Sequence, residues 1–126
     1  MWTFRNFKRD EFVCPCGCGF DDIDPLIVTT LQRLRDEVQR PVIVNSGCRC
    51  KSHNAAVKGS KTSQHLKGKA ADIKIDGMTS GQIIDVIRRL YLDGEIYVGY
   101  VYAINGASVH VDVRAPQSQT VRRWTR

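Results

Sequence analysis

The chain has 126 residues. This length allows one domain with a substantial core, spanning residues 1–126, and excludes two domains. No apolar run approaches the roughly 20 residues of a membrane-spanning helix, so membrane insertion is not expected. The net charge of +6 favours an anionic partner, but the dispersed basic residues lack the aromatic interleaving of a nucleic-acid binder.

Helical and alternating apolar spacing together predict the elements of the chain. Residues 1–22 form an irregular, cysteine-rich segment. Asp24 followed by Pro25 is typical of a helix start, because the acid caps the first turn and proline fits the first helical position. We then expect, in chain order, a helix at 25–39, a strand at 42–44, a short helix at 50–57, a loop at 58–69, a strand at 70–75, a helix at 80–92, and a hairpin of strands 96–103 and 108–113. This order predicts an α+β domain with a small, mainly antiparallel sheet flanked by helices.

The cysteines fall into two groups, and their odd number argues against a simple disulfide framework. The groups are Cys14, Cys16 and Cys18, and Cys48 and Cys50. One interpretation is a structural zinc held by four of the five thiolates. The others are one or two disulfides between the groups, or reduced thiols packed in a small core. In each case the cysteines are structural and clip the amino-terminal segment to the turn that carries Arg49.

Two of the three histidines and one carboxylate are candidates for a catalytic zinc site. Asp72 and His110 lie in two strand-like runs and converge on one face if these strands pair, and the turn between His65 and Asp72 can bring His65 to them. A catalytic zinc has three protein ligands and an open position for water. Strand periodicity places Asp112 on the same face as His110. Without a metal, the same residues would be ordinary polar strand and turn residues.

These residues also carry a resemblance to a known family. The motifs are Ser46-Gly47-Cys48-Arg49, His53-Asn54, Ser63-x-His65-x-x-Gly68-x-Ala70-x-Asp72 and His110-x-Asp112. Between about residues 5 and 115, the chain resembles the zinc D-Ala-D-Ala carboxypeptidase and endolysin superfamily, and in particular the compact M15-type peptidases of phages and bacteria. The resemblance implies the single-domain fold shared by hedgehog proteins and D-Ala-D-Ala peptidases.

The resemblance also implies roles for individual residues. His65, Asp72 and His110 would bind Zn²⁺. Arg49 would face the substrate and stabilise a carboxylate or a developing oxyanion, and Ser63 would hydrogen-bond substrate or support the site.

The chain departs from the family at the expected general base. Many members carry Glu or Asp three residues before the last zinc histidine, where this chain has Ala107. Asp112 is the best substitute, or it instead orients His110 or a nearby arginine. His53 is a weaker candidate for either role, and Tyr100 and Tyr102 either line the cleft or simply pack.

We therefore predict a monomeric zinc metallopeptidase, acting as a carboxypeptidase or endopeptidase on a stem or cross-link peptide of bacterial peptidoglycan. The alternatives are a non-catalytic, zinc-stabilised module that binds wall peptide or a protein partner, and a basic nucleic-acid-binding protein with a cysteine zinc site. The amino terminus lacks the apolar stretch of a secretory signal. We accordingly expect a phage lysis or virion protein, or a prophage copy, made in the cytoplasm and acting on the wall after release.

Overall fold

The structure, a computed structural model, describes residues 2–114 and the backbone of residues 122–125. Its helices are α1 (Pro25–Val38), α2 (Lys51–Ala56) and α3 (Ser80–Leu92), with 3-10 turns η1 (Arg9–Phe12) and η2 (Gln64–Lys67). Its strands are β1 (Ile43–Ser46), β2 (Ala70–Lys74), β3 (Tyr100–Ala103), β4 (Ser108–Asp112) and β5 (Arg122–Thr125). The α+β fold predicted from the sequence is confirmed.

The strands form one sheet in the order β1-β2-β4-β3-β5. The pairs β1–β2, β2–β4 and β3–β4 are antiparallel, and β5 joins β3 in parallel at the edge. The sheet is therefore mainly antiparallel, as expected, but its fifth strand was not predicted. The expected hairpin is present, although its first strand begins at Tyr100 rather than at residue 96.

Local capping explains where the two long helices begin and end. The Asp24 carboxylate accepts a hydrogen bond from the Leu26 amide at 2.9 Å, and Pro25 occupies the first helical position of α1. Helix α3 begins with a reciprocal capping box, in which Thr79 and Gln82 each bind the other's backbone amide. Gly94, with φ of +75°, follows the end of α3 in a left-handed conformation.

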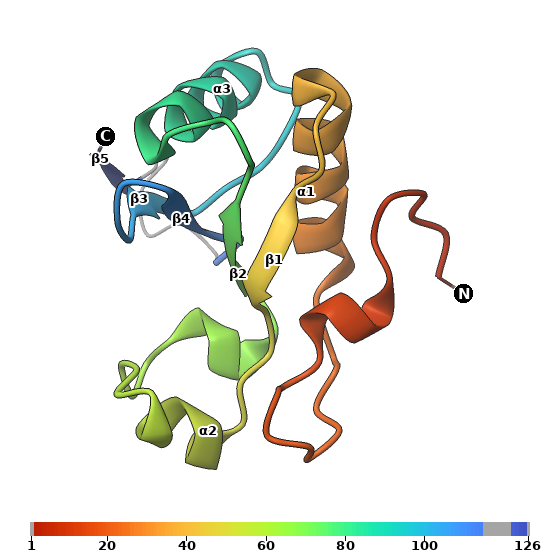
Figure 1. The fold of residues 1–126 in the computed structure, drawn as a ribbon, viewed down its shortest axis with the longest axis vertical. Helices are drawn as coiled ribbons and strands as arrows, with labels where there is room; N and C mark the ends of the chain where they lie inside the picture. The colour runs from red at the N-terminus through yellow and green to blue at the C-terminus, as the bar shows by residue number, and fades with distance from the viewer. Residues whose placement is uncertain (1, 115–121, 126) are drawn as a thin grey trace.

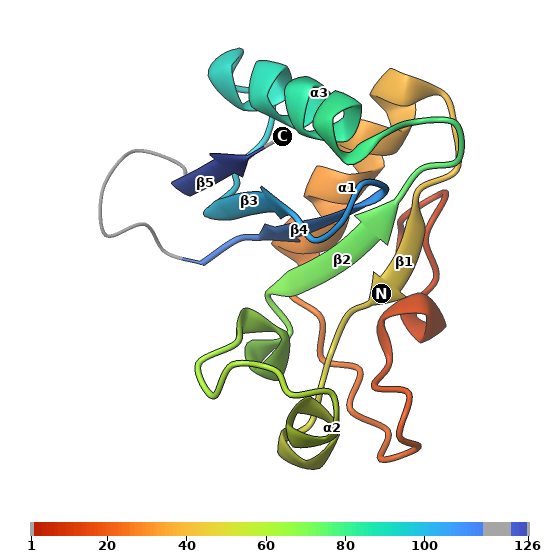
Figure 2. The same cartoon turned by 60° about the vertical axis from the view of Figure 1, so that its left-hand side comes forward.

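The two faces of the sheet have different surroundings. Helices α1 and α3 cover one face (Figure 2). Their apolar side chains form a buried core with those of alternate strand residues such as Ile73, Val109 and Val111. Because successive strand residues point to opposite faces, the residues between them project to the other side of the sheet. Asp72 and His110 are therefore on the face away from this core.

The lower part of the molecule in Figure 1 lies at the end of the sheet where β1 finishes and β2 begins. There α2, η2 and the loop that follows η1 lie beyond the ends of β1 and β2, on the side away from α3 (Figures 1 and 2). No helix in the part of the chain that the structure describes has the length and apolar character needed to cross a membrane.

Candidate active site

Three predicted zinc ligands meet on the open face of the sheet. Asp72 on β2 lies directly opposite His110 on β4 in the antiparallel register, and η2 brings His65 to both. Nε2 of His65 and Nδ1 of His110 each lie 3.1 Å from the same Oδ1 atom of Asp72. The three candidate ligand atoms all lie within 4.8 Å of one another. The two strands pair, and the convergence expected on that condition is present, whereas the role of these residues as zinc ligands stays a prediction.

In His65 and His110, the ring nitrogen farther from Asp72 makes a hydrogen bond of its own. These two bonds fix which nitrogen of each ring carries the proton. Nδ1 of His65 donates to the carbonyl oxygen of Gly47 at 2.6 Å, and Nε2 of His110 donates to Oδ2 of Asp112 at 2.8 Å. Both partners are acceptors, so these nitrogens carry the ring protons. In the neutral histidines, the lone pairs on the other nitrogens point at the Asp72 carboxylate.

This arrangement fits a divalent zinc ion. A tetrahedral zinc with bonds of about 2.0–2.2 Å holds its ligand atoms about 3.4 Å apart, close to the 3.1 Å separations found here. Two nitrogen lone pairs and a carboxylate oxygen facing one another leave an excess of acceptors that a cation would balance. Among the described residues, His65, Asp72 and His110 thus form a group that could hold a zinc ion at this face.

The charges of the site are set by competing effects. Burial alone would raise the pKa of Asp72, but hydrogen bonds that His110 and His65 donate when these ring nitrogens are protonated outweigh it and hold the pKa well below its usual range. Burial alone would lower the pKa of His110, but the carboxylates of Asp112 and Asp72 raise it overall. Burial would likewise raise the pKa of Asp112, yet His110 and Arg114 lower it. Asp72 and Asp112 are consequently both anionic near neutral pH.

Asp112 is fully buried and has several hydrogen-bond donors. Besides His110, its carboxylate accepts bonds from Nε and Nη2 of Arg114, the latter at 2.6 Å, and from the Tyr100 amide at 3.0 Å. A carboxylate held in this way can orient His110, which is one of the two roles considered for it. Its catalytic role stays a prediction, and the contacts favour the orienting role.

Arg49 binds the other carboxylate oxygen of Asp72. Its Nη2 donates to Oδ2 of Asp72, its Nε to Oγ of Ser46, and its Nη1 to Oδ1 of Asn54, each at 3.1 Å. The side chain is only 13% exposed. The predicted contact with substrate is untested, but three of the five guanidinium N–H groups are already directed at the protein.

Ser63 supports the turn that carries the first histidine. Its hydroxyl accepts the His65 amide at 3.2 Å at the start of η2, and Gly68, with φ of +67°, ends this turn. The His65 carbonyl in turn accepts the Arg49 amide at 3.0 Å. The backbone therefore joins the Arg49 segment to the His65 turn.

A cleft of about 610 Å³ opens over these residues. Its walls include the three candidate ligands, Arg49 and Ser63, together with residues from the hairpin and the 57–64 segment. The Tyr102 ring stacks on His110 with centroids 4.6 Å apart, and the Arg114 guanidinium lies over the Tyr100 ring at 3.6 Å. Both tyrosines line the cleft, which resolves the two interpretations offered for them.

Comparison with known proteins agrees with this geometry. The sequence profile of the family described as Peptidase M15 matches residues 5–112. The chain belongs to the peptidase M15 family. The resemblance inferred from the motifs is confirmed, and the family supports a hydrolase that cleaves peptides. No curated protein matches the chain significantly.

Three residues of this M15 site had no assigned role in the sequence analysis. They are Asn54, which holds Arg49, Arg114, which holds Asp112, and Gly47, whose carbonyl fixes the ring of His65. Arg114 follows Asp112 at the two-residue strand spacing, a signal that could have identified it. His53, the third histidine, lies on α2 and outside the ligand set. Ala107 is exposed at the hairpin turn.

Proposed function

We propose that this M15 family member is a zinc-dependent peptidase that hydrolyses a peptide bond in bacterial peptidoglycan. The observation that carries the proposal is the convergence of His65 Nε2, His110 Nδ1 and Asp72 Oδ1 at the base of an open cleft. The choice of substrate rests on the resemblance to D-Ala-D-Ala peptidases and on the net charge of +6, which suits an anionic wall. The protein would reach the wall after release from the cell, or within a phage particle.

The metal would supply Lewis acidity, lowering the pKa of a water at its open position to about 7 and polarising the scissile carbonyl. The protein's own residues hold this centre in place. Gly47 and Asp112 fix the ring nitrogens of His65 and His110, and Arg49 fixes the free oxygen of Asp72. Hydrogen-bonded outer partners of this kind commonly raise metal affinity or activity by about 10- to 100-fold.

Substrate would lie between the hairpin and the segment that carries Ser63. Arg49 and Arg114 both line this cleft, and two guanidinium groups suit a peptide with a terminal or side-chain carboxylate. Tyr100 and Tyr102 provide flat walls against which a peptide can pack. Guanidinium groups that face the cleft would thus suit the acidic stem peptides of the wall.

The experiment is digestion of defined muropeptides by the purified protein, with product analysis by mass spectrometry. We expect cleavage that a chelator abolishes and Zn²⁺ restores, and the products would show whether the enzyme is a carboxypeptidase or an endopeptidase. His65→Ala should remove activity. His53→Ala is the matched control, since this histidine lies outside the ligand set, and should retain it. Cleavage that survives both chelation and His65→Ala would contradict the proposal.

One observation favours a non-catalytic binding module as the second candidate. Among the described residues that line the cleft, Asp72 is the only carboxylate, and it is committed to the metal-binding set. A protein without a separate acid or base could hold wall peptide without cutting it. This alternative predicts saturable muropeptide binding by calorimetry with no product after long incubation.

A further inference from the structure

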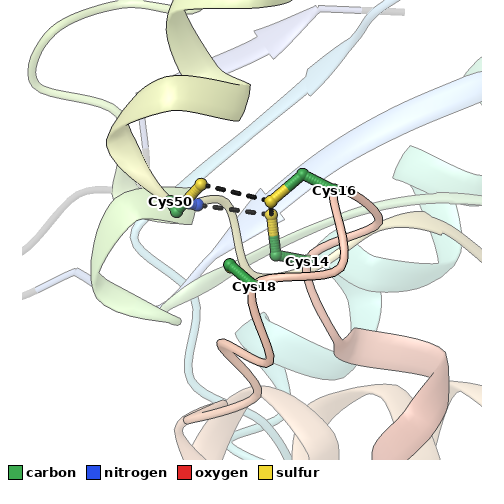
Figure 3. A group of neighbouring side chains, drawn as sticks. All are labelled: Cys14, Cys16, Cys18 and Cys50. Atoms are coloured by element: carbon green, nitrogen blue, oxygen red, sulfur yellow. Dashed lines mark hydrogen bonds between the residues drawn. The ribbon is translucent and has the colours of Figure 1, made fainter.

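The amino-terminal segment and the start of α2 bring four cysteines together (Figure 3), none of which belongs to the histidine site. They are Cys14, Cys16, Cys18 and Cys50. Their four sulfur atoms lie within 4.8 Å of one another, and every cysteine is a free thiol in the structure. We propose that these four cysteines hold a structural zinc ion.

The sulfur separations suit a metal better than a disulfide. A tetrahedral zinc with Zn–S bonds of about 2.3 Å places its sulfurs about 3.8 Å apart. Sγ of Cys16 lies 3.5 Å from Sγ of Cys14 and 3.5 Å from Sγ of Cys50. One sulfur thus has two equivalent neighbours, whereas a disulfide would single out one partner at about 2.05 Å.

Backbone amides point at three of the sulfurs. The Cys50 amide lies 3.5 Å from Sγ of Cys14, the Phe20 amide 3.5 Å from Sγ of Cys18, and the His53 amide 3.4 Å from Sγ of Cys50. Zinc binds cysteine as the thiolate, and N–H groups directed at sulfur stabilise that negative charge. The backbone around the cluster therefore already favours the metal-binding form.

Two glycines allow the first three cysteines to face inward from a short loop. Gly17 and Gly19 alternate with the cysteines and have φ of +87° and +86°, in the left-handed region that other residues rarely adopt. No atom lies within 4 Å of where a Cβ would stand on either glycine, so conformation and not space requires glycine there.

The fifth cysteine, Cys48, differs from the other four because it is buried in the apolar core. Cys48 is fully buried among apolar core side chains and does not belong to the group of four. Its amide donates to the Phe12 carbonyl, at the end of η1, at 2.8 Å. This explains the odd count: four cysteines bind metal and one packs in the core.

The proposed ion would connect the amino-terminal segment to the active site. Cys50 caps the first turn of α2 and is the neighbour of Arg49, whose guanidinium braces Asp72. The metal would therefore fix the start of α2 and the segment before it. The proposal does not depend on peptidase activity, because the cysteine cluster shares no residue with the histidine set.

The test measures zinc per chain in a His65→Ala/His110→Ala double variant, from which the histidine site has been removed. We expect one zinc per chain in this protein, and none after further substitution Cys16→Ser. Cys48→Ala in the same background is the matched control and should keep its zinc. Absence of zinc from the double variant, or equal loss in the Cys16 and Cys48 variants, would overturn the proposal.

Two measurements on the double variant itself guard against misfolding of the cysteine variants. Cobalt(II) in place of zinc should give the thiolate-to-metal charge-transfer absorption of a sulfur-ligated tetrahedral ion, and its absence would contradict the site. Alkylation after unfolding without reductant should label all five cysteines. Labelling of only three would reveal a disulfide and would likewise reject the zinc site.

Discussion

Nε2 of His110 donates a hydrogen bond to Oδ2 of Asp112 at 2.8 Å, so that the other ring nitrogen faces Asp72. The two residues stand two positions apart on β4, with both side chains on the face away from the helices. Arg114 pairs with the buried carboxylate, and its Nη2 lies 2.6 Å from the same Oδ2 atom. Asp112 would thus act on the proposed metal through His110.

For Asp112→Asn, we expect zinc affinity to fall about 10- to 100-fold, since the amide loses the charge that orients His110. Activity should largely return at saturating zinc. Calorimetric zinc titration and muropeptide kinetics would measure both effects. Asp93→Asn, at an exposed carboxylate beyond α3, is the control and should change neither. Unchanged zinc affinity with turnover lost at saturating zinc would instead indicate that Asp112 is the general base.

The hydrogen bonds from Arg49 to Asp72 and its neighbours predict that lysine cannot replace arginine at this position. The ammonium of Arg49→Lys is a point charge and cannot bind Ser46, Asn54 and Asp72 together. Losing a charge-assisted hydrogen bond costs about 1.5–3 kcal/mol, so we expect zinc affinity to fall at least tenfold. Arg5→Lys, at an exposed pair with Asp36, is the control. A raised KM for peptides with normal zinc affinity would show that Arg49 serves the substrate instead.

Stacking of Tyr102 on His110 predicts that the ring, and not the hydroxyl, supports the site. Aromatic pairs contribute about 0.5–1.5 kcal/mol, so Tyr102→Ala should weaken zinc binding by about two- to tenfold. Tyr102→Phe should bind zinc as the wild type does. Equal losses in the two variants, measured by competition with a chromogenic chelator, would show that the hydroxyl carries the effect.

Gly68 lies between His65 and Asp72 in the motif, and the structure explains why this position requires glycine. An added Cβ would collide with the carbonyl oxygen of Asp22, and φ of +67° is itself unfavourable for other residues. Gly68→Ala should therefore lower the free energy of unfolding by more than the roughly 1–2 kcal/mol of a left-handed alanine. Gly94→Ala is the matched control, with φ of +75° and no atom within 4 Å of its Cβ, and should cost only that amount. Equal losses in urea denaturation would show that the collision is relieved at no cost.

Much of the fold could be predicted because its signals are local. Asp24-Pro25 marks the start of α1, and Asn105-Gly106 marks the hairpin, where Oδ1 of Asn105 accepts the amides of Ala107 and Ser108. The parallel pairing of β5 with β3 had no such signal, since it depends on which sheet edge is free. Residues 96–99 look strand-like in sequence but precede the ladder, which begins at Tyr100.

The candidate site was predictable to the extent that its ligands lie on paired strands. The pairing of β2 with β4 places Asp72 opposite His110, as the alternating pattern indicated. The brace from Arg49 and the exclusion of Cys48 from the sulfur cluster were not predictable, because both depend on packing between distant segments. Sequence spacing identified which residue types gather, and tertiary contacts determined which atoms face one another.

The most direct test of the central claim is a crystal structure of the zinc-loaded protein, with anomalous diffraction recorded at the zinc absorption edge. We predict a peak about 2.0–2.2 Å from Nε2 of His65, Nδ1 of His110 and Oδ1 of Asp72. The peak should disappear in His110→Ala and persist in His53→Ala. Absence of a peak between these three residues in zinc-saturated crystals would contradict the assignment of the site.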